Sequence, residues 1–224
     1  MKLKLLAHTL RPVEAICTAI AIMKEKEPWE FVRNLNQKEK ETMIQEILKS
    51  RLRGALEFAS FEFLLEDVTR AFTHQLVRHR AFHFSQQSMR FFDASMSGFR
   101  MPKSMTESGA DVYGHVERVF DFYKELIGRG IPTEDARSIL PTNVETKIMF
   151  GATMRGLIEL AEVRMCWQAQ GEFRQAMDGI REGVTQANPF LGSLLVSACA
   201  RSGHCEFKSV YDRSCPIETE RRRA

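Results

Sequence analysis

The chain has 224 residues, of which 44% are hydrophobic and 27% charged, and its formal net charge is +3. This length suits one domain with a sizeable core, or at most two small domains. So mild a positive balance does not require nucleic-acid binding, and it suits an enzyme with a small anionic substrate equally well. No run of residues approaches the roughly 18–20 apolar residues of a membrane span, and the N-terminus lacks the pattern of a signal peptide. These features predict a cytoplasmic protein.

The five cysteines argue against a disulfide framework. Their number is odd and no CxxC pair occurs, which favours reduced thiols. His204, Cys205 and Cys215 lie near one another in the sequence, but their spacing fits no common zinc pattern. We therefore expect no metal site.

The first part of the chain is predicted to contain a strand followed by two helices. Residues 1–8 are predicted to form a strand, with Met1, Leu3 and Leu5 on one face. Pro12 stands where a helix can begin. Asn36 and Glu39 have the spacing of a capping box, which predicts the start of a second helix. Gly54 is the expected end of that helix.

The middle of the chain changes character twice. Residues 56–65 are rich in Phe and Leu with partial alternation, which predicts a strand. Residues 68–76 then follow helical spacing. Residues 78–92 follow neither the alternation of a strand nor the spacing of a helix. They mix arginine, histidine, serine, glutamine and phenylalanine.

The second half of the chain is predicted to be helical throughout. Apolar residues recur there at the spacing of one helix face, and glycine or proline punctuates the segments. The expected helices cover 108–127, a short stretch from Thr133 to before Pro141, 144–165, 170–184 and 189–200.

No internal repeat, linker or break in composition divides the chain. We therefore expect one α+β domain, richer in helix than in strand, over residues 1–215. Residues 216–224, which end in three consecutive arginines and an alanine, are expected to be a disordered tail.

The segment 75–90 is the first candidate for chemistry. Arg78, His79 and Arg80 form a row of cationic or potentially cationic groups, and hydroxyl and amide side chains follow them. Arginine offers planar, bidentate donors that suit phosphate. The neighbouring phenylalanines could stack on a planar ring. The segment thus favours a nucleotide or another phosphorylated planar ligand, with a solvated basic turn at a helix end as the alternative.

The segment 146–174 is the second candidate. It is apolar nearly all round from residue 148 to 165, yet it carries Arg155, Glu159, Glu162 and Arg164. Arg155 and Glu159 are four residues apart and can pair on one helix. Arg155 and Arg164 are nine apart, on nearly opposite faces of a straight helix, and so are expected to serve different partners. Purely structural ion pairs are the alternative.

Common nucleotide and hydrolase motifs are absent from the sequence. It has no GxGxxG and no GxxxxGK[ST], so a bound dinucleotide would not use a Rossmann or P-loop cradle. It also lacks GxSxG and HExxH, which disfavours the common hydrolase classes.

Together these residues resemble the flavin-dependent thymidylate synthase family. Arg78-His79-Arg80, followed after seven residues by Ser88, is similar to the family's RHRx7S signature. Gln75 precedes the triplet, and Phe91 stands where the family usually has Tyr. Further blocks resemble the family in the same order, over most of residues 1–190: 4–9, 136–141, 155–157 and 163–174.

The resemblance implies a fold and a reaction. The fold would be an α+β domain with a central antiparallel or mixed sheet flanked by helices. The protein would be a homotetramer with active sites shared between subunits, and no nucleic-acid or membrane partner is expected. NADPH would reduce FAD, methylenetetrahydrofolate would supply one carbon to dUMP, and dTMP would be the product.

The resemblance also implies roles for individual residues. Arg164 would act on the uracil by stabilising negative charge, which is preorganised electrostatic catalysis. A nucleophilic Ser88 would need an adjacent base, for which His79 is the candidate, and a binding role for Ser88 is favoured. The residues expected to bind dUMP are Gln75, Gln86, Gln87, Ser88, Arg90, Arg137 and Arg164. Those expected to bind FAD are Arg78, His79, Arg80, Gln86, Thr153, Arg155, Glu159 and Gln168.

Departures from the family pattern cluster on the flavin side. Thr153 and Glu159 replace common asparagines, Gln168 replaces a frequent His or Arg, and Phe58 replaces a His. This asymmetry motivates an alternative, a divergent dUMP-modifying enzyme such as a 5-hydroxymethyl-dUMP-forming transferase. The positive charge leaves a third possibility, a non-catalytic nucleotide- or RNA-binding protein.

Overall fold

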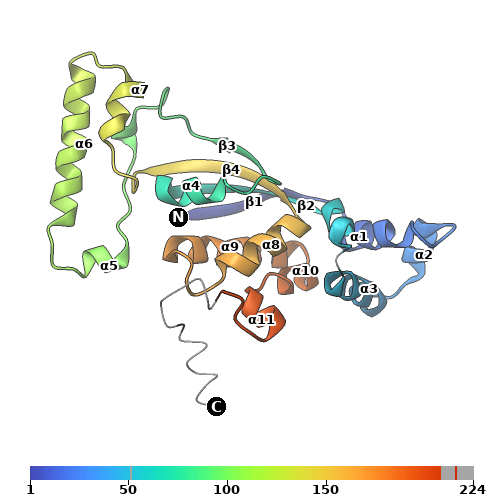
Figure 1. The fold of residues 1–224 in the computed structure, drawn as a ribbon. Helices are drawn as coiled ribbons and strands as arrows, with labels where there is room; N and C mark the ends of the chain where they lie inside the picture. Colours follow the sequence, from blue (N-terminus) through green and yellow to red (C-terminus); the bar gives the residue numbers. More distant parts are fainter. Residues whose placement is uncertain (51, 208–214, 216–224) are drawn as a thin grey trace. The chain divides into compact units, whose positions relative to one another are not determined.

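The computed structural model describes residues 1–50, 52–207 and 215, and its fold is of the α+β class (Figure 1). The described strands form one four-stranded sheet in the order β1-β2-β4-β3, so β2 and β4 are its inner strands. This agrees with the fold class that the sequence predicts. The strands are β1 (Lys2–His8), β2 (Ser60–Thr69), β3 (His83–Gln86) and β4 (Glu145–Thr153).

The chain forms two compact units. The first comprises residues 1–3, 64–80 and 84–150, and the second comprises residues 4–63, 81–83 and the described residues from 151 onward. The expectation of a single domain over residues 1–215 stays a prediction. The expected tail at 216–224 lies outside the described residues.

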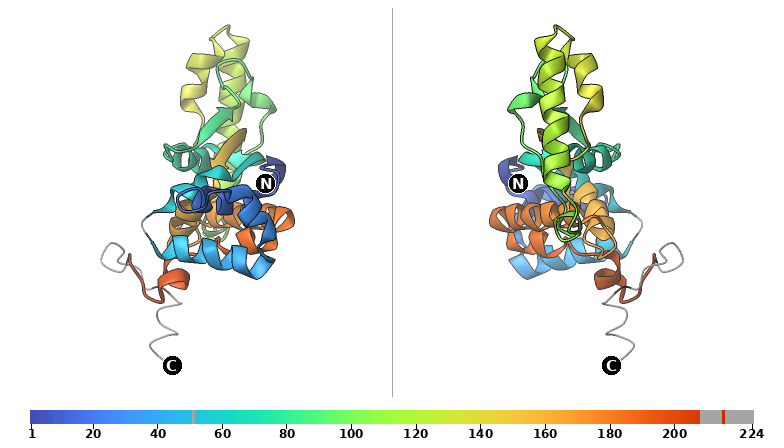
Figure 2. Two further views of the ribbon diagram at one scale, coloured as in Figure 1. Left: turned by 90° about the vertical axis from the view of Figure 1, so that its right-hand side faces the viewer. Right: turned by 90° about the vertical axis from the view of Figure 1, so that its left-hand side faces the viewer.

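The first unit is built around a long helix, α6, which stands beside the short helix α7 (Figures 1 and 2). Tyr123 of α6 is fully buried, and its hydroxyl accepts the backbone N–H of Ala94 at 3.2 Å. Phe120, on the same helix, packs in one cluster with Val144, the residue just before β4. The helices are α4 (Arg70–Leu76), α5 (Lys103–Thr106), α6 (Val112–Gly128) and α7 (Thr133–Ala136), with 3-10 turns η2 (Ala94–Met96) and η3 (Arg137–Ile139).

The second unit buries apolar faces of several helices. Ile16, Ile44 and Leu157, each from a different helix, are almost or completely inaccessible to solvent. The capping box predicted at Asn36 is present, because its Oδ1 accepts the N–H of Glu39 at 3.0 Å while the Glu39 carboxylate accepts the N–H of Asn36 at 2.8 Å. The elements are α1 (Pro12–Ala21), α2 (Pro28–Asn34), α3 (Gln37–Lys49), η1 (Arg53–Phe58), α8 (Met154–Arg164), α9 (Gly171–Ala187), α10 (Pro189–Ser193) and α11 (Ala198–Ser202).

The prediction of one long helix over 144–165 was wrong for the first half of that segment. That half is β4, in which Thr146, Ile148 and Phe150 are buried while Lys147 and Met149 are exposed, which is the two-residue period of a strand. The helix starts only after Thr153, whose hydroxyl accepts the N–H of Gly156 at 3.3 Å. The apolar run from residue 148 to 165 concealed this change of period.

Other element bounds also differ from the sequence predictions. The strand expected at 56–65 begins at Ser60, because the preceding residues form η1, and it continues to Thr69. Thr69 then caps α4 by accepting the N–H of Phe72 at 3.1 Å. Helix α3 ends at Lys49 rather than at Gly54. The helix expected over 189–200 is two short ones, α10 and α11, and α2 and β3 were not predicted.

The five cysteines, all among the described residues, are free thiols. Within the part of the chain that the structure describes, no helix has both the length and the apolar character needed to cross a membrane.

Candidate active site

The arginines of the basic triplet follow α4 directly. The chain leaves the helix in tight turns, in which the N–H of Arg78 donates to the carbonyl of Gln75 at 3.4 Å. Arg78 and Arg80 are exposed, and no described side chain pairs with either guanidinium. His79 is half-buried and makes contacts within the protein. The triplet therefore presents two cations to solvent.

The next residues form the short strand β3. The side-chain amide of Gln86 donates to Thr73 Oγ1 at 2.9 Å, so Gln86 is tied to α4. The N–H of Gln87 donates to the carbonyl of Lys147 at 3.0 Å, beyond the end of β3. Part of the segment 78–92, whose sequence followed neither the helix nor the strand period, thus forms a strand. Contacts with neighbouring elements hold it there.

His83 and Glu62 form a pair over Gly151. His83 Nε2 lies 3.2 Å from each carboxylate oxygen of Glu62. The two residues come from β3 and β2, and Gly151 belongs to β4, the strand between them. A Cβ at Gly151 would lie 2.0 Å from His83 Nε2 and 2.4 Å from Glu62 Oε2. The pair therefore requires glycine at this position, a relationship that sequence reasoning missed.

Ser88 lies exposed at a turn. Its Oγ accepts the N–H of Arg90 at 3.3 Å, and its carbonyl accepts the N–H groups of Phe91 and Phe92. Among the described side chains, none that could serve as a base contacts this hydroxyl. The serine is thus held by its own turn rather than by a histidine.

Two arginines contact Glu134 in the first unit, and a third lies near one of them. Arg90 Nε donates to the Glu134 carboxylate at 2.7 Å, and Arg137 Nε donates to the Glu134 carbonyl at 3.0 Å. Burial, together with the positive charge of Arg137, lowers the pKa of Arg70. Arg90 and Arg137 at Glu134, with Arg70 near Arg137, make a cationic centre suited to an anion. Sequence reasoning named Arg90 and Arg137 but missed Arg70 and Glu134, which no local motif marks.

Arg155 is held by two carboxylates in the second unit. Its Nε donates to Glu159 at 3.0 Å, which confirms the pairing predicted from their spacing, and its Nη1 donates to Glu57 at 2.7 Å. The hydrogen bonds that Arg155 donates to Glu159 and then to Glu57 raise its pKa. Glu57 comes from η1, far away in the sequence, and was not predicted. The cluster has one more negative than positive charge.

Arg164 ends α8 in the same unit. Its guanidinium lies over the ring of Phe173, with 4.6 Å between the guanidinium carbon and the ring centroid. Gln168 also makes contacts within the protein. Both residues are half-buried.

The residues expected to bind dUMP and FAD are divided between the two units. The first unit contains Gln75, Arg78, His79, Arg80, Gln86, Gln87, Ser88, Arg90 and Arg137, and the second contains Thr153, Arg155, Glu159, Arg164 and Gln168. Within the first unit, Arg90 and Arg137 are brought together at Glu134. The roles of all these residues stay predictions.

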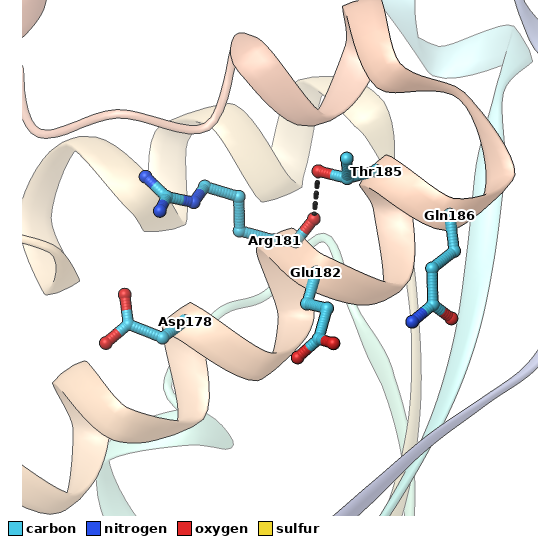
Figure 3. Close-up of a pocket in the computed structure, with 5 residues that line it drawn as sticks. All are labelled: Asp178, Arg181, Glu182, Thr185 and Gln186. Carbon is cyan, nitrogen blue, oxygen red and sulfur yellow. Dashed lines mark hydrogen bonds between the residues drawn. The ribbon is translucent and has the colours of Figure 1, made fainter.

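A shallow hollow on α9 contains none of these residues (Figure 3). It is lined by exposed side chains of one helix face, and the Thr185 hydroxyl donates to the carbonyl of Arg181 at 2.7 Å. Asp178 and Glu182 accompany Arg181 there. This is the usual composition of a solvated helix face, and nothing in it resembles the predicted site.

Comparison with known protein families gives a clear match. The family model described as "Thymidylate synthase complementing protein" matches residues 4–190. The chain is 36% identical over 180 residues to a flavin-dependent thymidylate synthase of Geobacter sulfurreducens, covering 78% of each chain. It is 31% identical over 221 residues to the enzyme of that name from Nitratidesulfovibrio vulgaris, covering 91% of this chain and 90% of the relative.

Solved structures share the fold at low sequence identity. The UMP/dUMP methylase PolB from Streptomyces cacaoi, bound with 5-Br dUMP, superposes with a TM-score of 0.74 at 17% identity, covering 86% of this chain and 93% of that one. The flavin-dependent thymidylate synthase ThyX of Helicobacter pylori, complexed with FAD and dUMP, gives a TM-score of 0.71 at 15% identity, covering 88% and 100%. With the family match spanning most of its length, this chain belongs to the thymidylate synthase complementing protein family.

Proposed function

We propose that this protein is a flavin-dependent thymidylate synthase that converts dUMP to dTMP. Methylenetetrahydrofolate would supply the one-carbon unit, and NADPH would reduce the FAD. The proposal is supported by relatives of that name at 36% and 31% identity. The observation within the molecule that carries it is the meeting of Arg90 and Arg137 at Glu134, with Arg70 close enough to Arg137 for their charges to interact.

The arginine cluster is assigned to the phosphate of dUMP. Guanidinium groups bind phosphate through paired, charge-assisted hydrogen bonds. Only one of these arginines, Arg90, is paired with the Glu134 carboxylate. Gln75, Gln87 and Ser88 are assigned to the rest of the nucleotide. Arg164 is assigned to the uracil, where a fixed positive charge stabilises the negative charge that develops on the ring.

FAD would supply the hydride transfer when bound. The exposed guanidinium groups of Arg78 and Arg80 fit its diphosphate, since no described side chain neutralises them. Arg155 fits less well, because Glu57 and Glu159 already occupy it and outweigh its charge. We therefore assign the diphosphate to Arg78 and Arg80. His79, Gln86, Thr153, Glu159 and Gln168 are assigned to the cofactor by resemblance alone.

The assembly and the location are also proposals. We propose a homotetramer that works in the cytoplasm. Size-exclusion chromatography with light scattering tests the oligomeric state. A measured mass equal to that of one chain would contradict the proposed homotetramer.

Product analysis tests the proposed reaction. Purified protein is incubated with FAD, NADPH, methylenetetrahydrofolate and dUMP, and the nucleotides are resolved by mass spectrometry. The dTMP mass is expected. The 5-hydroxymethyl-dUMP mass would favour the divergent transferase, and unchanged dUMP would contradict both. Arg90→Ala is expected to abolish most of the product, whereas Arg129→Ala, which removes an exposed ion pair on α6, serves as the matched control.

A further inference from the structure

Thr73 of α4 is completely buried, and its hydroxyl bridges two groups of the first unit. It donates to the carbonyl of Arg70, three residues earlier on the same helix, at 3.1 Å. The same oxygen accepts the side-chain amide of Gln86, which comes from β3, at 2.9 Å. The first bond is a common local contact of threonine on a helix. The second joins α4 to a residue expected at a ligand site, although Thr73 itself was not expected there.

The two bonds determine which end of the Gln86 amide faces Thr73. A hydroxyl has a single proton, and here the carbonyl of Arg70 accepts it. The group that faces the Thr73 oxygen must therefore be a donor, which is the NH2 of Gln86. The opposite orientation would bring two acceptors together unless the hydroxyl gave up Arg70. The hydrogen-bond network thus assigns the orientation of the amide.

The carbonyl oxygen of Gln86 is left as an available acceptor. Gln86 is half-buried, and none of the described residues donates to this oxygen. Phe84, two residues earlier and so on the same face of β3, packs against Phe150 with 6.5 Å between the ring centroids. This face of the strand therefore combines an aromatic side chain with one oriented acceptor. Such a pairing suits a planar ring that carries a hydrogen-bond donor.

We propose that Thr73 is a positioning residue, which holds the Gln86 amide so that its carbonyl accepts the imide N–H of a pyrimidinedione ring. This inference rests on the proposed function, for which the resemblance implies Gln86 at both dUMP and FAD. Uracil and the flavin ring share the imide, an N–H between two carbonyl groups. Because Thr73 is buried, it acts through Gln86.

Cytosine distinguishes an oriented amide from a free one. Its ring has a bare nitrogen, an acceptor, where uracil has the imide N–H. In wild type this nitrogen would face the carbonyl of Gln86, and two acceptors repel each other. Thr73→Val keeps the shape of the side chain but removes the hydroxyl, so the amide can turn its NH2 toward cytosine. The ratio of the Kd values of dCMP and dUMP therefore reports the orientation.

Thr73→Val should reduce the preference for dUMP over dCMP about three- to tenfold, the value of one hydrogen bond. Calorimetry on the full chain measures dUMP directly and dCMP by displacement. Thr73→Ser keeps the hydroxyl and should keep the wild-type preference. Thr185→Val is the matched control, because it also removes a hydroxyl that donates to a carbonyl of its own helix, on the face of α9 shown in Figure 3. It should leave the preference unchanged.

Gln86→Glu separates positioning from a general disturbance of α4. A carboxylate has acceptors at both ends, so it presents an acceptor to the ring in either orientation. Adding Thr73→Val to Gln86→Glu should therefore leave the preference of that variant unchanged. A disturbance of packing would instead lower the preference whether residue 86 is an amide or a carboxylate.

A flavin ring at Gln86 would give a different signature. The nucleotide preference would then stay constant, and the bound flavin would change instead. An acceptor on the imide N–H opposes the loss of its proton, whereas an amide NH2 stabilises the resulting anion. Bound FAD in Thr73→Val should thus lose this proton at a lower pH than in wild type, and in Thr73→Ser at the wild-type pH. Absorbance follows this loss over the pH range in which all three proteins stay folded.

Two results would overturn the inference. One is a Thr73→Val variant that changes neither the nucleotide preference nor the deprotonation of the flavin. The other is a change in preference that is equally large with glutamate at position 86. The product assay separates this inference from the proposed function. Formation of dTMP with an indifferent Thr73 would keep the function and reject the inference, and an altered preference without dTMP would do the opposite.

Discussion

Arg90 Nε donates a 2.7 Å hydrogen bond to the carboxylate of Glu134, across 44 residues of sequence. The contact places Arg90 beside Arg137, which donates to the carbonyl of the same glutamate. Glu134 thus gathers the cationic cluster and also partly neutralises it. In the proposed function, the phosphate of dUMP competes with this carboxylate for Arg90.

Glu134→Gln should bind dUMP about two- to fivefold more tightly than wild type. The amide keeps an acceptor for Arg90 but removes the competing charge, and an exposed pair of this kind contributes up to about 1 kcal/mol. Arg90→Ala should bind dUMP at least about tenfold more weakly. Calorimetry at fixed salt measures both. Glu125→Gln, which removes an ion pair with Arg129 on α6, is the control. Weaker dUMP binding by Glu134→Gln would contradict the competition.

Gly151→Ala should destabilise the fold by about 1–3 kcal/mol, because the new methyl group overlaps His83 and Glu62. His83→Ala removes one of the overlapping groups. The double variant should therefore be more stable than Gly151→Ala alone, by about 0.5 kcal/mol or more. Urea unfolding of the four proteins of this cycle measures the coupling. Strictly additive losses would show that the pair does not require the glycine.

Burial raises the pKa of the Cys17 thiol to about 12, from an ordinary value of 9.0. A pKa raised in the folded state stabilises the protein fully below pH 9, and this stabilisation is lost as the pH rises toward 12. The free energy of unfolding should fall across this window by up to about 1.4 kcal/mol per pH unit from this residue. Cys17→Ala should remove that part of the slope. An unchanged slope in urea titrations at pH 8 to 11 would contradict the assignment.

Thr146→Val should stabilise the ligand-free protein by about 1 kcal/mol. The variant keeps the shape of the side chain and removes a buried hydroxyl without a partner among the described residues. Valine also suits a strand at least as well as threonine does. Urea unfolding without ligand is the measurement, with Thr142→Val at an exposed position as the comparison. A loss of stability would show that the hydroxyl is satisfied.

Local patterns predicted much of the fold. The capping box of α3, the apolar face of α6 and the extent of α9 depend on residues within a few positions of one another, so the sequence shows them directly. The sequence prediction missed the boundary between β4 and α8 because both elements are rich in apolar residues. Only the packing around Thr146, Ile148 and Phe150 separates them.

The sequence predicted those residues of the candidate site that belong to a short local motif. Arg78 to Ser88 and the spacing of Arg155 and Glu159 are visible in the sequence. Contacts between distant segments are not, which is why Glu57 beside Arg155 and Glu134 beside Arg90 were missed. The backbone hydrogen bonds that join Gly98 and Gln87 to β4 likewise follow from no spacing in the sequence.

Anaerobic reoxidation of the bound flavin tests the central claim most directly. The protein is loaded with FAD, reduced with NADPH, and its absorbance in the blue region is followed while dUMP and methylenetetrahydrofolate are added. The proposed function predicts that the oxidised spectrum returns only when both are present, with dTMP formed in equal amount. Failure to retain flavin, or a flavin that stays reduced with both substrates present, would contradict it.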